Sequence, residues 1–290
     1  MTTGNTYTDI LADSLDTVLT SARLIREYPA RMPGLVEKHT LGQGTGLSWR
    51  EVSLAQITAS SISETTEFDN PQQLSDTLFS ITPSVVGIET LITDRVRERI
   101  AKASWARVGA LAQNGIQRQK DSDGLTVFGG ASTTLAGAGT TLTAGHIAAA
   151  VYRISSNTTE PANPPFFFVG HGFQLKDLWD EITAGVGTYP VPTGMSGDAY
   201  RQSWRGSVAG ADAHEDGNIT IDSNSDAPGG VFAKEAIVLV QGRSPWIEKE
   251  RKQIGGGAWA IFHYDEYAYG ERSSGNWLYR ILSDATNPTS

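Results

Sequence analysis

The sequence predicts an α+β protein with one core and an elongated part that extends from it. Residues 78–92 form a β-run of fifteen residues, which at about 3.3 Å per residue would reach roughly 50 Å. Residues 94–123 have the apolar spacing of one long helix, and after Gly130 short helices and strands alternate. A compact domain of 290 residues has a radius of gyration of only about 19 Å, so the β-run must extend beyond it.

The N-terminal residues 7–28 predict an amphipathic helix that ends at Tyr28-Pro29. Acidic residues come early and arginines late, which suits the helix dipole. Farther on, "GQGTG" at 42–46 has the glycine spacing of a phosphate loop. It is followed by the strand-like "LSWREVSL" and not by a helix, so we do not interpret it as a phosphate site.

"LSWREVSL" and the β-run at 78–92 flank a polar stretch, residues 55–74, and together predict a long hairpin. Pro83 cannot donate to a ladder, so it marks an edge or a bulge. An isolated two-stranded ribbon is marginal in water. The apolar side chains of this ribbon that need cover are Trp49, Val52, Leu54, Phe79, Val86, Ile88 and Ile92. We expect that cover to come from another copy of the chain or from another protein.

Beyond the hairpin, Asp94 or Thr93 caps the predicted helix at 94–123. Another helix begins after the cap residue Thr143, a buried strand covers 165–170, and a helix covers 172–182. We interpret residues 210–230 as a polar loop and 236–240 as a strand. The remaining residues mostly alternate between apolar and polar, which is typical of β-strands.

Composition excludes several classes of protein. The net charge of −9 argues against a sequence-specific nucleic-acid reader, so any contact with DNA would be loose and non-specific. The chain has no cysteine, which excludes disulfides and cysteine-ligated metal. Charged residues interrupt the first thirty positions, so we predict no signal peptide. The uncharged stretch at 125–152 lacks sustained apolar character, and we expect no membrane span there.

Three patterns suggest chemistry, and none of them is complete. Residues 212–223 match a calcium-binding EF-hand loop at several places but have His214 at the third and Ser223 at the twelfth. The five histidines fall at no zinc spacing, so each is interpreted as a cap, turn or surface residue. "GMSGD" around Ser196 misses the nucleophile elbow by one position. We therefore predict no enzyme and no catalytic, cofactor or metal site; the alternative is a soluble hydrolase using loops near His171 or His214.

The charge pattern indicates self-association. The polar stretch of the hairpin is acidic, whereas the helix after it begins with basic residues. We predict a head-to-tail contact between copies made by Glu64, Glu67, Phe68, Asp69, Arg95, Arg97 and Arg99. Replacing the three arginines with glutamate is expected to weaken assembly and leave the subunit folded. The alternative is two solvated faces, because one exposed ion pair contributes at most about 1 kcal/mol.

An ordered set of segments resembles the major capsid proteins of tailed bacteriophages, which have the Hong Kong 97-type fold. The resemblance covers roughly residues 35–285, and no single motif is diagnostic. The segments that carry it are "LGQGTGLSWREV", "ISETTEFDNPQQLSDTLFSITPSVVGIETLITDRV", "GALAQNGIQRQKDSDGL", "LTAGHIAAAVYRI", "PPFFFVGHGFQLKDLWDEI", "GGVFAKEAIVLV" and "IEKERKQIGGGAWAIFHYDEYAYGERSSGNWLYRIL".

The resemblance implies an N-terminal arm at 1–41 and an extended loop at 42–80. It also implies a peripheral domain at 81–129 and 241–290, built around a long spine helix, and an axial α/β domain at 130–240. The long β-run would then be one side of the extended loop and its return strand, lying across the peripheral domain of a neighbouring subunit.

The resemblance further implies a non-enzymatic shell protein. Its copies would form hexamers and pentamers of an icosahedral head, assembled in the host cytoplasm around double-stranded DNA. Implied partners are a separate scaffolding protein, a portal and, as a further candidate, a cement protein; we expect no covalent crosslinks and no membrane. An encapsulin-like nanocompartment shell, which encloses enzyme cargo, is the alternative with the same fold.

Overall fold

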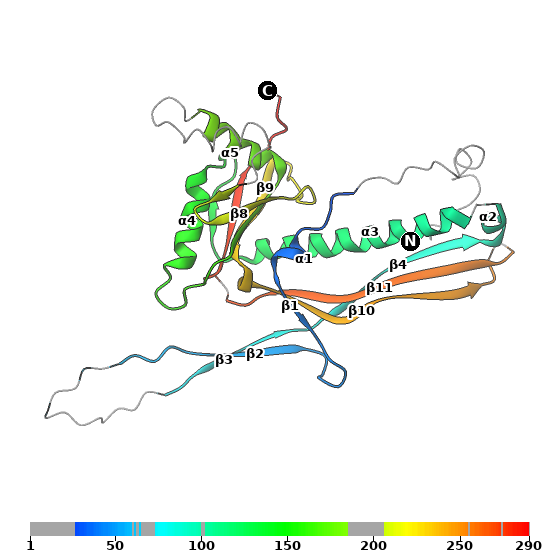
Figure 1. Ribbon diagram of the computed structural model, residues 1–290, viewed down its shortest axis with the longest axis horizontal. Coiled ribbons are helices and arrows are strands. Elements are labelled where there is room, and N and C mark those ends of the chain that lie inside the picture. The colour runs from blue at the N-terminus through cyan, green and yellow to red at the C-terminus, as the bar shows by residue number, and fades with distance from the viewer. Residues whose placement is uncertain are drawn as a thin grey trace.

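The computed structural model describes residues 27–59, 61, 64, 73–99, 102–184, 206–254, 256–273 and 275–289. The helix predicted at 7–28 lies outside these ranges except for its last two residues. Figure 1 shows two parts side by side: a rounded α/β part, and an extended part in which long strands run beside one long helix. A separate two-stranded hairpin leaves the extended part.

The rounded part is built on a six-stranded sheet with the order β5-β12-β9-β6-β8-β7. Its strands are β5 (Thr134–Ala136), β6 (Phe166–Gly170), β7 (Ser207–Val208), β8 (Ala211–Glu215), β9 (Asp226–Ala233) and β12 (Leu278–Asp284). Helix α4 (Ala144–Ser155) packs on β9 and β12, and helix α5 (Gly172–Ala184) directly follows β6. Thr143 caps α4 in a capping box with His146, which confirms the predicted helix start.

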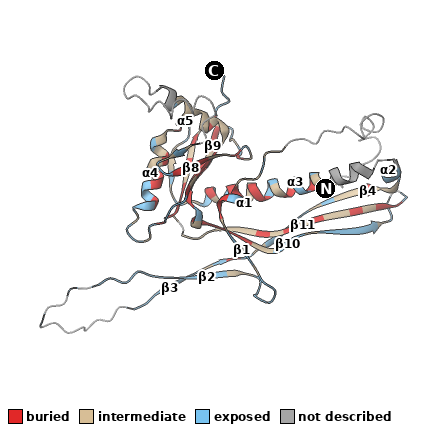
Figure 2. Ribbon diagram, viewed as in Figure 1, coloured by how far each residue is buried: buried red, intermediate tan, exposed pale blue. Residues whose placement is uncertain are grey.

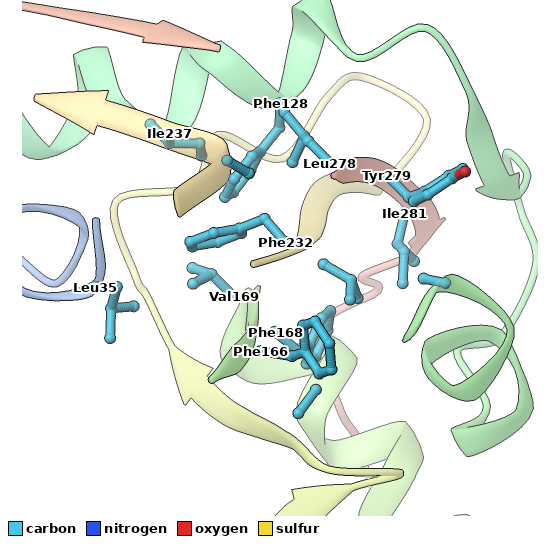
Figure 3. Packing of buried hydrophobic residues seen from close by; sticks show 14 of the residues in the cluster. Leu35, Phe128, Phe166, Phe168, Val169, Phe232, Ile237, Leu278, Tyr279 and Ile281 are labelled. Carbon is cyan, nitrogen blue, oxygen red and sulfur yellow. The ribbon is translucent and has the colours of Figure 1, made fainter. Parts of the chain in front are cut away.

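The main hydrophobic core lies between this sheet and its helices (Figure 3). Phe128, Phe168 and Phe232 are completely buried, and the rings of Phe128 and Phe232 are 5.7 Å apart. Each such side chain contributes about 1.5–3 kcal/mol when it leaves water. The predicted buried strand at 165–170 is confirmed as β6, whose residues supply part of this core.

The extended part is a four-stranded sheet with the order β1-β10-β11-β4. It contains β1 (Glu37–Thr40), β4 (Ser84–Thr93), β10 (Ile237–Lys252) and β11 (Ala258–Glu271). Near it lie the helices α1 (Met32–Leu35), α2 (Asp94–Arg99) and α3 (Lys102–Thr126), and α3 continues into the 3-10 turn η3 (Val127–Gly130). Figure 2 shows that burial falls along β10 away from the rounded part.

The hairpin is shorter than the sequence predicted. β2 (Trp49–Leu54) pairs with β3 (Asp76–Ile81), but the chain then leaves the ribbon at Thr82-Pro83. The second half of the predicted β-run becomes β4, which pairs along its whole length with β11 of the same chain. The prediction of one fifteen-residue hairpin strand was therefore wrong. Pro83 has no N–H to continue the β2–β3 ladder, so the run divides there.

One further region differs from the sequence prediction. Residues 210–230, interpreted as a polar loop, contain β8 and the start of β9. Ala211 and Ala213 are buried on one face of β8, which pairs in parallel with β6, so tertiary packing overrides the polar composition. The short 3-10 turn η5 (Lys234–Ala236) leads into β10.

The structure divides the C-terminal strands between the two sheets. β12 hydrogen-bonds to β5 and β9 of the six-stranded sheet, although the implied division groups residues 241–290 with the long helix. β10 begins at Ile237 and belongs to the other sheet. The exact division of the chain into domains stays a proposal.

The uncharged stretch at 125–152 contains the end of α3, the turn η3, β5 and most of α4. No helix among the described residues combines the length and apolar character needed to cross a bilayer.

Candidate assembly surfaces

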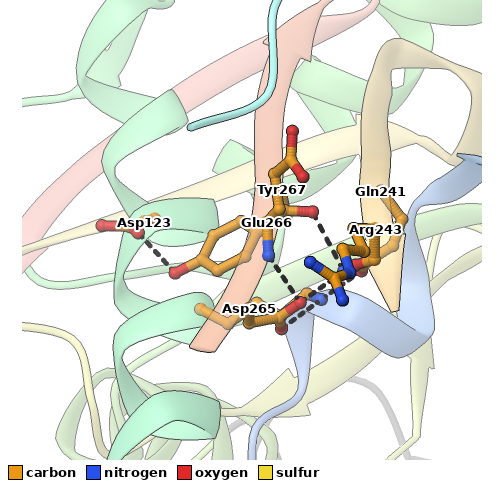
Figure 4. A network of polar contacts seen from close by, with 7 residues as sticks. Asp123, Gln241, Arg243, Asp265, Glu266 and Tyr267 are labelled. Carbon is orange, nitrogen blue, oxygen red and sulfur yellow. Dashed lines mark hydrogen bonds and ion pairs between the residues drawn. The ribbon is translucent and has the colours of Figure 1, made fainter. Parts of the chain in front are cut away.

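A buried polar network fastens helix α3 to the four-stranded sheet (Figure 4). Lys120 Nζ lies 3.0 Å from Asp265 Oδ2 and donates to Gln241 Oε1 at 2.6 Å. The Tyr267 hydroxyl donates to Asp123 Oδ2 at 2.7 Å. Burial, with Asp123 beside the hydroxyl, raises the pKa of Tyr267 above its usual range. The network joins α3, β10 and β11, so the extended part keeps its form without a partner.

The opposite face of the sheet presents a row of aromatic side chains. Asp265 and Tyr267 point to α3, so the alternating residues Phe262 and Tyr264 point away from it. Tyr264 is directly opposite Trp246 of β10, with ring centroids 5.1 Å apart, and Phe262 and Tyr264 are stacked at 5.9 Å. All three are half-buried. We call Trp246, Tyr264 and Phe262 the aromatic row.

Cationic side chains lie at both ends of the aromatic row. Arg243 is 4.1 Å above the ring of Trp246, and Lys252 is 5.2 Å from the ring of Phe262. Lys252 also donates to Glu89 Oε1 of β4. This arrangement holds the rings in place and leaves a mixed aromatic and charged surface.

The base of the hairpin is anchored in its own subunit. Trp49 stacks on His39 at 4.6 Å and meets Phe79 edge-on at 5.9 Å. Arg272 donates from Nε to Glu51 of β2 at 2.8 Å and from a terminal nitrogen to Glu37 of β1 at 2.6 Å. The hydrogen bond from Arg272 lowers the pKa of Glu37. Ile81, Val238 and Val240 form a small core beneath this base.

The outer half of the hairpin has an apolar face that none of the described residues covers. Val52 and Leu78 are directly paired across the ribbon, and Leu54 lies on the same face. These side chains are 55%, 58% and 70% exposed. Ile57 and Leu74, just beyond the paired strands, are also exposed. We call Val52, Leu54 and Leu78 the apolar hairpin face.

The structure corrects the expectation about which apolar residues lack cover. Val86 packs against the main core, Ile88 lies against Gly115 of α3, and Ile92 is buried. Trp49 and Phe79 pack on the small core at the base of the hairpin. The prediction was therefore wrong for these five residues, because β4 joins the sheet of its own subunit and the base of the hairpin packs on the small core. Val52 and Leu54 remain exposed as predicted.

The predicted contact residues are only partly described. Glu64 is exposed, whereas Glu67, Phe68 and Asp69 lie outside the described residues. Arg95 and Arg97 are exposed on α2, and the side chain of Arg99 is not among those described.

Arg97 also has a neighbour in its own subunit. Its guanidinium is 6.0 Å from the ring of Trp259. Arg251 lies 5.2 Å from the same ring and forms an ion pair with Asp94. The contact between the acidic stretch and the helix start stays a prediction.

The aromatic row was not predicted. The sequence feature that could have indicated it is the aromatic alternation of "IFHYDEY".

The regions of the hydrolase alternative have structural roles. His171 Nδ1 accepts the N–H of Phe173 at the start of α5, and His146 completes the capping box of α4. Burial lowers the pKa of His171. An open polar pocket of about 490 Å³ beside β8 includes His214, Asp212 and Arg31 in its wall. Among the described residues, no three side chains of metal-ligating type are grouped to hold an ion.

Comparisons with known proteins identify the fold. No protein-family model and no curated protein sequence matches the chain. A solved structure from Mycobacterium phage Che8 is 15% identical, with a TM-score of 0.70, and the match covers 92% of this chain and 96% of that one. The head structure of Helicobacter pylori bacteriophage KHP40 is 11% identical, with a TM-score of 0.72 and coverage of 92% and 95%.

The capsid of Cyanophage P-SCSP1u is also similar, at 11% identity and a TM-score of 0.70, with coverage of 96% and 95%. The likeness extends over nearly the whole of each chain at very low sequence identity. The predicted α+β fold of phage capsid proteins is therefore confirmed.

Proposed function

We propose that this chain is the major capsid protein of a tailed bacteriophage and that its copies assemble into the icosahedral shell around the double-stranded DNA genome. The observation that carries the proposal is the apolar hairpin face, which stands exposed on a two-stranded extension. Such an extension gains stability when another surface covers it. The shared fold with solved phage capsids and heads supports the same role.

We propose that the aromatic row of a second copy covers the apolar hairpin face. It offers partly exposed rings on the sheet face opposite α3, whereas the hairpin offers aliphatic side chains. The two surfaces are different patches of one chain, so the contact is heterologous. Repeated heterologous contacts close into rings when the rotation allows. We propose that these rings are the hexamers and pentamers of the shell.

The finer assignments rest on the resemblance to the capsid family. We propose assembly in the host cytoplasm with a separate scaffolding protein and a portal, and a cement protein as a further partner. The net charge of −9 suits an inner wall that contacts DNA loosely. The role is structural, so we assign no residue to catalysis.

The first test is negative-stain electron microscopy of the expressed chain after size-exclusion chromatography, with and without candidate scaffolding protein. We expect polyhedral shells or rings in the void fractions. Nuclease-resistant DNA inside native particles would distinguish a phage head from a nanocompartment with protein cargo. A chain that stays monomeric or dimeric under both conditions would contradict the shell function.

A variant pair tests the apolar hairpin face directly. We expect Val52→Asp combined with Leu78→Asp to prevent assembly, because two charges would have to be desolvated at the contact. Ser53→Asp combined with Thr77→Asp is the matched control, since these residues are directly paired, exposed and on the other face of the ribbon. The control should assemble, and circular dichroism should show that both variants are folded. Equal assembly of the two variants would remove the apolar hairpin face from the proposal.

A further inference from the structure

A pair of buried carboxyl groups lies where three segments of the chain meet. Asp121 of α3 and Asp216, which follows β8, are both fully buried. Asp121 Oδ1 accepts the backbone N–H groups of Arg31 at 2.7 Å and Met32 at 2.8 Å. Asp121 Oδ2 accepts a hydrogen bond from Asn218 Nδ2 at 2.7 Å. Asp121 thereby joins the start of α1, the helix α3 and the segment after β8.

Asp216 also belongs to this junction, and one of its carboxyl oxygens has no hydrogen-bond donor among the described residues. Its backbone N–H donates to the carbonyl of Gly170 at 2.9 Å, and its Oδ1 accepts the N–H of Asn218 at 2.9 Å. Oδ2 is buried, and no donor among the described residues reaches it. Asn218 brings the two carboxyl groups together, because its backbone N–H donates to Asp216 Oδ1 and its side-chain Nδ2 donates to Asp121 Oδ2. Ionised carboxylates only accept hydrogen bonds, so a bond between the two requires one proton.

The proton belongs on Asp216. Three N–H donors already stabilise the ionised form of Asp121, whereas Asp216 has one. Burial, together with the neighbouring Asp121, raises the pKa of Asp216 to about 7, against the opposing influence of the Asn218 N–H and the Arg31 cation.

Other titratable groups lie around the junction, and His214 of β8 lines the same open pocket as Arg31. Glu27 and Arg118 lie 3.6 Å apart as an ion pair. Burial raises the pKa of Tyr269, which is close to Asp121, so this tyrosine stays neutral. Burial lowers the pKa of His171 against the opposing influence of Glu215, so this histidine loses its proton at a lower pH than an exposed histidine does. Asp216 is the acid here whose pKa is raised to about 7, and the variant Asp216→Asn distinguishes it from His214, two residues earlier on β8.

We propose that Asp216 and Asp121 share one proton and form a proton-dependent latch that holds residues 27–32 on helix α3 and on the end of β8. When the proton leaves, two buried negative charges face each other and the latch opens more often. The Tyr28 hydroxyl, which donates to the carbonyl of Glu215 at 3.1 Å, is released in the same opening. The latch lies within one subunit and does not depend on the proposed function.

The direction of the pH dependence follows from the raised pKa. An acid whose pKa is higher in the closed state binds a proton more tightly there, so closure is favoured at low pH and lost as the pH rises through about 7. If opening returns Asp216 to its ordinary pKa of 3.8, the equilibrium constant for opening rises about 20-fold between pH 5.5 and 7.5.

Hydrogen exchange with mass spectrometry on the full chain tests the latch. For peptides covering residues 27–36, exchange corrected for intrinsic rates should increase about 20-fold between pH 5.5 and 7.5 in the wild type. Asp216→Asn mimics the protonated acid and should stay protected at both pH values. Asp121→Ala removes both oxygens that accept these three N–H groups and should exchange fast at both pH values.

Asp180→Asn is the control, because Asp180 is a surface carboxylate paired with Lys176 on α5. It should reproduce the wild-type pH dependence. The latch is overturned if wild-type protection of residues 27–36 does not fall with pH, or if Asp216→Asn shows the same fall as the wild type. The wild-type measurement decides the question even if a variant fails to fold, and it is independent of whether shells form.

Discussion

The six-stranded sheet and the β2–β3 hairpin cover their strands in different ways. Most residues of β9 are buried within the chain, in the core around Phe232, whereas the outer residues of β2 and β3 are almost all exposed. The first region gains its stability from its own helices and neighbouring strands. Among the described residues, the second is fixed at its base, by Arg272 and the small core that contains Ile81. This difference separates the part that folds the subunit from the part that is free to contact another one.

The largest effect should come from the core of the six-stranded sheet. We expect Phe232→Ala to lower the free energy of unfolding by about 3–5 kcal/mol, because it leaves a cavity beside Phe128. Leu54→Ala on the exposed hairpin should change it by no more than about 0.5 kcal/mol. Urea unfolding of unassembled subunits, followed by tryptophan fluorescence, measures both. Similar losses for the two variants would contradict the division between a folding core and a free extension.

A second test concerns the joint between α3 and the four-stranded sheet. Lys120→Met should cost about 3 kcal/mol of unfolding free energy, because it leaves the buried Asp265 without its cation. The double variant Lys120→Met/Asp265→Asn should recover part of that loss. Urea unfolding of Lys120→Met, Asp265→Asn and the double variant measures the coupling. If the double variant is as unstable as the sum of the two single ones, the ion pair does not fasten the helix to the sheet.

The smallest effect should come from the anchor at the base of the hairpin. Arg272→Gln should lower the free energy of local opening of β2 and β3, measured by hydrogen exchange, by about 1 kcal/mol. The effect is small because Glu37 and Glu51 are partly solvated.

Wild-type protection of the hairpin base has a defined pH dependence. The pKa of Glu37 is lowered in the folded chain, so its contribution is complete above its ordinary pKa of 4.5 and is lost as the pH falls through the lowered value. Below the lowered pKa, the wild type should therefore approach the behaviour of Arg272→Gln at pH 6. A pH-independent wild type would show that the Arg272 and Glu37 contact does not hold the hairpin.

Local sequence patterns predicted most elements of the fold. The long helix after Asp94, the cap at Thr143, the buried strand at 165–170 and the helix at 172–182 correspond to α2 and α3, α4, β6 and α5. These elements depend on capping, dipole and periodicity within a short stretch of chain. The helix predicted at 7–28 is not described, so that prediction remains untested.

The candidate surfaces were less predictable. Val52 and Leu54 were identified as apolar and uncovered, but their partner Leu78 and the aromatic row depend on which residues face each other across two ladders. Strand β8 shows the same limit, because its small buried alanines become a strand only beside β6. The side-chain period of two fixes which residues share a face, and pairing alone decides which face meets the core.

The sequence by itself determined the composition of this protein, its long helix, its capping residues and the presence of a strand-rich extension. It also carried the resemblance to phage capsid proteins, because the order of the segments is a property of the chain. The tertiary structure decided that the β-run divides at Pro83, that β4 joins β11, and that Asp121 meets Asp216. Local propensity acts over a few residues, whereas these contacts join positions far apart in sequence, whose pairing is selected only by the packing of the whole chain.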